Sequence, residues 1–203
     1  MLKVFKILNN TTVEGPGNRF CIWVQGCNKH CKGCYAVSSW DFNSGKNYTV
    51  ESLFTLIKNE KDKIEGVTFL GGEPLEQAKE LYNLAKLIKE NLGLSIICFS
   101  GYTYEEIKEK NDNNINNLLK YTDILIDGGF EKDKFDLSRP WVGSSNQRYI
   151  FLSDRYNLNQ ILNYKNKIEI HIDKQGNLDI NGMGNFDEIN RKFCLQLGEN
   201  IVK

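Results

Sequence analysis

The chain has 203 residues, of which 40% are hydrophobic and 26% are charged. This is the composition of an ordinary globular protein and argues against extensive disorder. Lysine plus arginine and aspartate plus glutamate both number 26, so the net charge is zero. A general electrostatic grip on nucleic acid or on an anionic membrane is therefore not expected. Because there is no bilayer-length apolar run and no signal-peptide pattern, we expect a cytoplasmic protein.

Strands and helices alternate along the first two thirds of the chain. Apolar, β-branched runs predict strands at residues 20–25, 67–70, 94–100 and 124–126. Helical spacing of apolar residues predicts helices at 50–60 and 81–88 and short helices around Ile107 and Leu118. Thr49 is a predicted N-cap, and Gly93 is a predicted helix end.

This alternation predicts right-handed βαβ units and a mostly parallel sheet, whose ligands bind beyond the carboxyl ends of the strands. Each predicted strand ends in a small or polar cluster, so these clusters should share one face of the molecule. They are Gly26-Cys27, Gly71-Gly72-Glu73, Ser100-Gly101-Tyr102 and Asp127-Gly128-Gly129. The predicted fold class is α/β, a partial (β/α) barrel of about five to six mostly parallel strands.

The last quarter of the chain has a different pattern. Residues 167–173 and 178–180 alternate between polar and apolar, which predicts an antiparallel hairpin with one face in water. His171 is expected on that wet face. Residues 186–196 are a candidate helix. The predicted organisation is a core domain at 1–154 and a C-terminal hairpin and helix extension at 155–203 that packs on or beside it.

Three of the six cysteines, Cys27, Cys31 and Cys34, form a C-x3-C-x2-C loop. Thiolates this close together can hold one compact iron–sulfur or zinc centre. A [4Fe–4S] cluster usually takes four cysteines, so three leave one iron open to a small molecule. The alternative is a zinc site completed by His30 or a distant ligand. The cluster is favoured because the chain has no second pair of closely spaced Cys and His ligands.

The remaining cysteines and a glycine-rich turn complete the candidate residues. Cys21 and Cys98 lie inside predicted strands and are expected to pack as small hydrophobic side chains. The turn Leu70-Gly71-Gly72-Glu73-Pro74 exposes backbone groups to a ligand, and its carboxylate can accept a hydrogen bond from an ammonium group. Its alternative interpretation is a simple strand-to-helix turn with a helix-starting proline.

Together, the cysteine loop and this turn resemble the radical S-adenosylmethionine (radical SAM) enzymes and, among them, the activating proteins of anaerobic ribonucleotide reductase. The resemblance spans about residues 3–152. The matching stretches are Val13-Glu14-Gly15-Pro16-Gly17-Asn18-Arg19, Gly26-Cys27 to Cys34-Tyr35, Trp40-Asp41-Phe42-Asn43-Ser44-Gly45, Gly71-Gly72-Glu73-Pro74, Ser100-Gly101-Tyr102, Asp127-Gly128 and Gly143-Ser144-Ser145-Asn146-Gln147.

The resemblance implies one [4Fe–4S] cluster on Cys27, Cys31 and Cys34, with S-adenosylmethionine chelating the fourth iron. It further implies a set of cofactor-binding residues: Gly71, Gly72 and Glu73 at the ammonium group, Gly33 and Tyr35 near the adenine, and Ser100, Asp127 and Asn146 along the wall and loop of the site. One electron would cleave the cofactor to a 5′-deoxyadenosyl radical, which would take a hydrogen atom from a backbone glycine of a partner. The implied partners are a glycyl radical enzyme and a flavodoxin or ferredoxin as electron donor.

Some residues depart from the family pattern, and these departures bear on the identity of the partner more than on the cofactor chemistry. Gly129 and Val142 stand where Lys and Arg are common, and the extension at 155–203 exceeds the usual compact activating protein. Two alternatives therefore stay open. One is a radical SAM enzyme that modifies a peptide or small molecule, and the other is a zinc-stabilised interaction module without enzymatic activity. The sequence does not indicate an oligomeric state.

Overall fold

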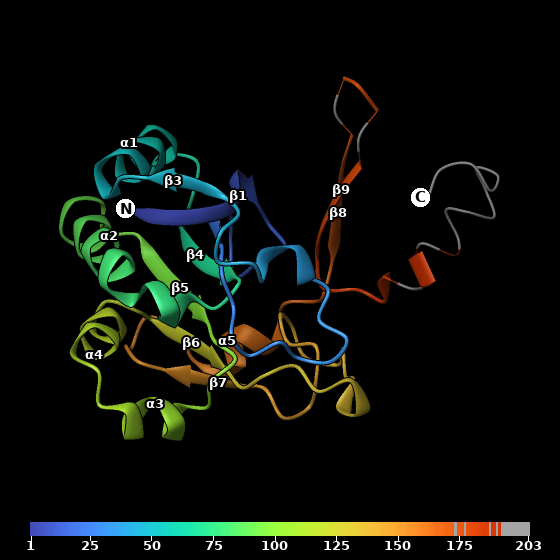
Figure 1. Cartoon of the computed structure of the whole chain (residues 1–203). Helices are drawn as coiled ribbons and strands as arrows, with labels where there is room; N and C mark the ends of the chain where they lie inside the picture. The colour runs from blue at the N-terminus through green and yellow to red at the C-terminus, as the bar shows by residue number, and fades with distance from the viewer. Residues whose placement is uncertain (173, 177, 187, 190, 192–203) are drawn as a thin grey trace.

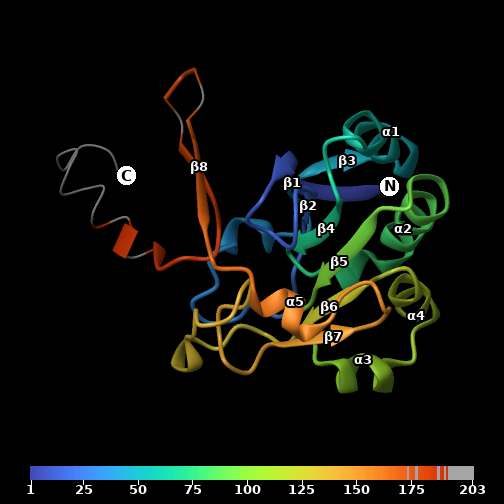
Figure 2. The same cartoon turned by 180° about the vertical axis from the view of Figure 1, so that it is seen from behind.

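The computed structural model is a mixed α/β fold built on one central sheet (Figure 1). It describes residues 1–172, 174–176, 178–186, 188–189 and 191. Four neighbouring strands of the sheet are parallel, so their carboxyl ends lie at the same edge. A separate hairpin stands beside the body (Figures 1 and 2).

The central sheet has seven strands. In spatial order they are β3 (Lys46–Tyr48), β1 (Leu2–Thr11), β2 (Arg19–Val24), β4 (Gly66–Gly71), β5 (Ser95–Phe99), β6 (Ile124–Asp127) and β7 (Arg148–Phe151). Strands β2, β4, β5 and β6 are mutually parallel, as predicted. Strands β1, β3 and β7 are antiparallel to their neighbours, so the sheet has more strands than expected and a smaller parallel share.

Helices α1, α2 and α4 cover one face of this sheet (Figure 1). The helices are α1 (Val50–Glu60), α2 (Ala78–Leu92), α3 (Tyr104–Lys110), α4 (Asn113–Lys120) and α5 (Leu158–Leu162), with 3-10 turns at Val37–Ser39, Pro74–Gln77 and Lys132–Lys134. The predicted caps are confirmed. The Thr49 side chain accepts a hydrogen bond from the Ser52 amide, and Gly93 ends α2 in the left-handed conformation.

The main core lies between these helices and the sheet. Buried side chains of β2 and β4, such as Phe20 and Phe69, pack with Leu84 and Ile88 of α2. The opposite face of the sheet carries smaller clusters. Cys98 belongs to the main core and Cys21 to a cluster on the opposite face, both with no exposed surface, which confirms that they are packing residues.

The predicted hairpin is formed by β8 (Ile168–Ile172) and β9 (Leu178–Gly182). It projects past the rest of the body (Figures 1 and 2). His171 is exposed, as expected. The expectation that the polar face points wholly to water is wrong, because Glu169 and Asp179 on that face bind side chains at and just after β1. The candidate helix at 186–196 falls mostly outside the described residues.

Arg19, the first residue of β2, is completely buried beneath the loop that precedes it. Its guanidinium donates five hydrogen bonds: to Thr68 Oγ1, to the carbonyls of Pro16, Val67 and Ser95, and to Ser95 Oγ. Burial lowers its pKa. All these partners are neutral, so hydroxyl and carbonyl dipoles stabilise the buried charge. The same hydrogen bonds connect the starts of β2, β4 and β5.

Replacing Arg19 by Met is expected to lower the free energy of unfolding by more than about 3 kcal/mol, because several buried acceptors lose their donor. Urea unfolding of the anaerobically purified protein measures this loss. Arg155→Met is the matched control. Arg155 is exposed and donates one hydrogen bond to the Gly93 carbonyl, so its loss should stay under about 1 kcal/mol. Equal losses in the two variants would contradict this account.

Candidate metal centre

The carboxyl ends of the four parallel strands meet at one pocket of about 130 Å³. Cys27 follows β2, Glu73 follows β4, Gly101 follows β5 and Gly128 follows β6, and all four line this pocket. We call it the cysteine pocket. The predicted gathering of the strand-end clusters on one face is therefore confirmed.

All three cysteines of the C-x3-C-x2-C loop line the cysteine pocket. The loop is fixed at its start by a hydrogen bond from the Cys27 amide to the Trp40 carbonyl, at 3.0 Å. Burial raises the pKa of the Cys27 and Cys31 thiols. These thiols therefore stay protonated at neutral pH until a metal displaces their protons.

His30 does not join the three thiols in the pocket lining. Its ring stacks on the ring of Trp40, with the ring centroids 4.5 Å apart. This stacking accounts for the orientation of His30 without a metal, and it removes the nearest candidate for the fourth ligand of a zinc ion.

Gly71, the last residue of β4, and Gly72, which follows it, let the cysteine loop and the glycine-rich turn approach each other. A Cβ atom on Gly72 would lie 2.3 Å from the Gly26 carbonyl oxygen, and one on Gly71 would lie 2.7 Å from Trp23 Cα. The Glu73 amide donates to the same Gly26 carbonyl at 2.8 Å. The glycines are thus required by backbone packing as well as by any ligand.

The Glu73 carboxylate ties the end of β4 to the end of β5. It accepts hydrogen bonds from the Leu75 amide and Ser100 Oγ, each at 3.0 Å, and from the Gly101 amide at 2.7 Å. Burial raises its pKa to about 7. A carboxylate has about four acceptor sites, so one remains for a further donor such as a ligand ammonium group.

Asp127 is placed differently from the sequence-based expectation. Its carboxylate is fully buried and binds the Arg148 guanidinium and the Tyr104 amide. It is not among the residues that line the cysteine pocket, where the neighbouring Gly128 takes that position. Asp127 therefore holds the end of β6 in place, whereas Ser100 does reach the pocket lining.

A second cavity of about 380 Å³ adjoins the cysteine pocket. The two share Cys34, Gly71, Phe99, Phe130 and Gln147 as lining residues. We call it the second cavity. Its remaining lining comes from β1, β2 and β4, from the loops that contain Glu14, Tyr35 and Phe135, and from residues 179–184, which include the end of the hairpin.

The other predicted cofactor residues lie around these two cavities. Tyr35 lines the second cavity, and Gly33 lines a neighbouring surface pocket with it. Asn146 donates to the Gly129 carbonyl at 2.8 Å, and its Oδ1 is buried without a hydrogen-bond partner among the described residues. The sequence analysis missed Phe130, which carries no motif.

Gln147 lines both cavities. The sequence pointed to it only as the last residue of the Gly143–Gln147 motif, and it was not predicted as a site residue. Its side chain accepts hydrogen bonds from the amides of Gly143 and Ser144 and donates one to the Gly128 carbonyl. The Gly-Ser-Ser-Asn-Gln stretch was therefore the available signal for this residue.

The residues present fit an iron–sulfur cluster. Three thiols, the soft ligand type that such a cluster takes, line one pocket together with the glycines Gly71, Gly72, Gly101 and Gly128. A Cβ atom on Gly129 would lie 3.2 Å from Cys31 Sγ, so the absence of a side chain there leaves the thiol accessible. The unsatisfied Asn146 Oδ1 adds a buried acceptor on the loop beside Gly129.

Comparisons with known proteins agree with this geometry. The family described as 4Fe-4S single cluster domain matches residues 13–150. The anaerobic ribonucleoside-triphosphate reductase-activating protein of Enterobacteria phage T4 is 36% identical over 140 residues, which cover 67% of this chain and 85% of that protein. The chain belongs to this family of activating proteins. A cluster-binding domain is also a better match to the three cysteines than a zinc module.

Other relatives give the same picture. The activating protein of Vibrio cholerae is 37% identical over 141 residues, covering 66% of this chain and 88% of that protein, and that of Escherichia coli K12 is 33% identical over 141 residues. The crystal structure of QueE from Escherichia coli resembles half of the chain, with a TM-score of 0.41 and 21% identity, too low to support an argument. Among the described residues, no helix has the length and hydropathy of a membrane span.

Glu14, in the Val13–Arg19 stretch, is a further buried carboxyl group. It lines the second cavity, accepts a hydrogen bond from the Gly182 amide at 2.8 Å, and has its pKa raised to about 7 by burial. At pH values between 4.5, the ordinary pKa of a glutamate, and about 7, Glu14 keeps its proton in the folded protein and releases it in the unfolded chain. Glu14 therefore stabilises the fold at low pH, and this contribution is lost as the pH rises toward 7.

Glu14→Gln should remove this pH dependence and keep the acceptor for the Gly182 amide. The variant should become more stable relative to wild type as the pH rises from about 5 to about 8, by at most about 3 kcal/mol. Urea unfolding of the cluster-free protein at several pH values measures the difference. The control is Glu51→Gln, whose side chain is exposed in the first turn of α1. A stability difference for Glu14→Gln that is the same at every pH would contradict the assignment.

Proposed function

We propose that this protein reductively cleaves S-adenosylmethionine and generates a glycyl radical on an anaerobic ribonucleoside-triphosphate reductase. The observation that carries the proposal is the single pocket shared by Cys27, Cys31, Cys34 and Glu73 at the ends of the parallel strands. Family membership with proteins named as activators of that reductase supports the choice of partner.

In this proposal Cys27, Cys31 and Cys34 would hold three irons of one [4Fe–4S] cluster and leave the fourth open to the amino and carboxylate groups of S-adenosylmethionine. When bound, the two groups would supply radical chemistry: one electron would break the sulfur–C5′ bond to give methionine and a 5′-deoxyadenosyl radical, which would take a hydrogen atom from a glycine Cα and become 5′-deoxyadenosine. The chain's own contribution is to bind, to orient and to exclude water.

The remaining predicted residues have supporting roles. Backbone groups of Gly71 and Gly72 and the free acceptor site of Glu73 hold the ammonium group. Gly33 and Tyr35 lie near the adenine. Further residues complete the wall: Ser100 directly, Asp127 by fixing the end of β6, and Asn146 through its unsatisfied Oδ1.

We place the catalytic core at residues 1–154, with the sheet curving as a partial barrel around the cofactor and residues 155–203 as an extension beside it. The lining of the second cavity includes the aromatic side chains of Trp23, Phe99 and Phe130. These rings form an apolar part of the wall, which limits the water that reaches a reactive radical there.

Electron supply is assigned to a small acidic carrier of the flavodoxin or ferredoxin type. Lys32 and the cysteine loop around it reach the surface: Lys32 and Gly33 are exposed, and Cys31 and Cys34 are partly exposed. A carrier that docks on this loop would bring its redox centre close to the cluster, and the exposed lysine complements an acidic surface.

Anaerobic reconstitution with iron and sulfide tests the proposal. The reduced protein with S-adenosylmethionine should form 5′-deoxyadenosine, and Cys31→Ala should lower the yield at least about a hundredfold, because one iron loses its ligand. Cys98→Ala is the matched control, since Cys98 is buried in the main core and does not line the pocket. Product formation by Cys31→Ala at the wild-type level would refute the ligand assignment.

A further inference from the structure

The hairpin β8–β9 contacts the body of the protein through its polar face. In the register of the two strands, Glu169, Asp179 and Asn181 share one face. Glu169 accepts from Thr11 Oγ1 at 2.6 Å, Asp179 pairs with Lys6 Nζ at 2.6 Å, and Asn181 donates to Thr11 Oγ1 at 3.2 Å. This is the reverse of the usual arrangement, in which the apolar face of a hairpin packs on the core.

The apolar face of the hairpin is consequently turned away from β1. It consists of Ile168, Ile170, Ile172, Leu178 and Ile180. Ile168, Ile170 and Ile180 are half-buried, and Ile168 lies against Gly184, where an added Cβ atom would be 2.8 Å from Ile168 Cγ2. Ile172 and Leu178 are direct cross-strand partners with 69% and 42% of their surfaces exposed. A contiguous apolar surface of this kind is unfavourable in water and is typical of a surface that binds another protein.

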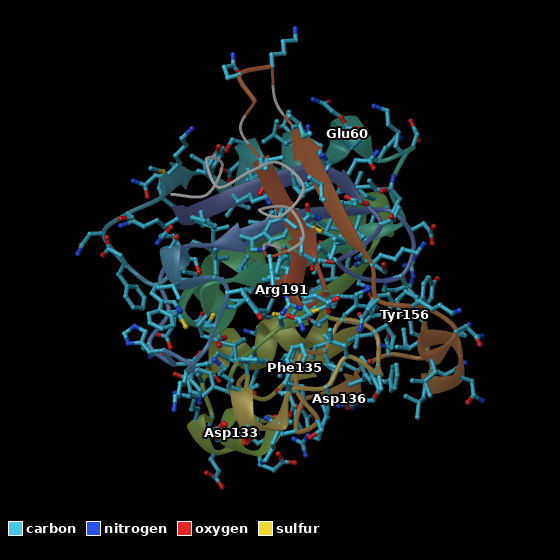
Figure 3. The ribbon with its side chains drawn as sticks, turned by 90° about the vertical axis from the view of Figure 1, so that its right-hand side faces the viewer. Glu60, Asp133, Phe135, Asp136, Tyr156 and Arg191 are labelled. Atoms are coloured by element: carbon cyan, nitrogen blue, oxygen red, sulfur yellow. The ribbon has the colours of Figure 1, made fainter. Side chains whose placement is uncertain are left out.

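This face continues into the second cavity. Ile180 belongs both to the apolar face and to the cavity lining, together with its neighbours in residues 179–184. The exposed rings of Tyr35 and Phe135 also line the cavity. In Figure 3, Phe135 lies below the lower end of the hairpin, whose tip extends past the body. A protein segment that enters the second cavity beside the hairpin therefore passes this apolar face.

We propose that the apolar face of β8–β9 is a docking surface for the glycine-bearing protein partner, an inference that rests on the proposed function. Ile172 and Leu178 pack against an apolar patch of that partner while its glycine segment enters the second cavity. The hairpin lies outside residues 13–150, which the family match covers. It therefore adds a partner contact to the core that the family shares.

The test compares two double variants of the full chain. In the hairpin variant, Ile172→Lys is combined with Leu178→Lys; in the control, Leu158→Lys is combined with Leu162→Lys. The control pair is on α5, has similar exposure (47% and 48%), and lines neither the cysteine pocket nor the second cavity. Lysine is tolerated on exposed strands and helices.

Two readouts are needed. The first is 5′-deoxyadenosine formed by the reconstituted, reduced protein without a partner. The second is the glycyl radical, measured by electron paramagnetic resonance while the anaerobic ribonucleoside-triphosphate reductase of the same organism is titrated. The hairpin variant should keep the first readout and need at least about tenfold more reductase for half-maximal radical, because few apolar residues dominate such interfaces. The control should match wild type in both.

Each other outcome has a defined meaning. Unchanged half-saturation in the hairpin variant, or equal weakening in both variants, would overturn the docking surface. A fall in the melting temperature of the hairpin variant alone would show that this chain covers the face itself, and would also overturn it. Absence of 5′-deoxyadenosine from cluster-loaded wild type would instead refute the proposed function, so the two failures are distinguishable.

Discussion

The close approach of the ends of β2 and β4 is the constraint on which the site depends. The Glu73 amide donates to the Gly26 carbonyl, and a side chain on Gly72 would collide with the same carbonyl oxygen. This backbone contact brings the cysteine loop, which follows β2, against the turn that follows β4. Parallel pairing of the two strands along their whole length makes the contact possible. The three cysteines and the proposed cofactor-binding turn are thus brought together by the secondary structure.

Buried polar groups then fix this end of the sheet. Glu73 joins the end of β4 to that of β5, and Asp127 joins the end of β6 to Arg148 at the start of β7. At the opposite end, Arg19 joins the starts of β2, β4 and β5. Each of these side chains has more than one partner, so loosening one strand end exposes charges that the neighbouring strands no longer satisfy. A rigid frame of this kind suits a site that must hold a reactive intermediate away from water.

Sequence reasoning predicted the parallel strands and the common face of their end clusters, the three cysteines included, because each rests on a local pattern. Buried strands such as β4 and β6 are short apolar runs, and Gly-Gly-Glu follows its strand directly. The missed elements lack such patterns. The sequence of strand β1 shows no regular alternation of polar and apolar residues. The strand is paired with β3 over only three residues, and much of the rest is partly exposed. The orientation of Asp127 and the polar contacts of the hairpin depend on residues far away in the chain, such as Arg148 and Thr11, and no local pattern encodes them.

In the proposed function, three cysteines leave one iron of a four-iron cluster open to S-adenosylmethionine. Mössbauer spectroscopy of protein reconstituted with isotopically enriched iron tests this most directly. On addition of S-adenosylmethionine, the account predicts that the signal of a single iron site shifts toward a higher coordination number while the other irons keep their signals. A cluster whose irons all remain unchanged, or a protein that takes up no cluster, would contradict it.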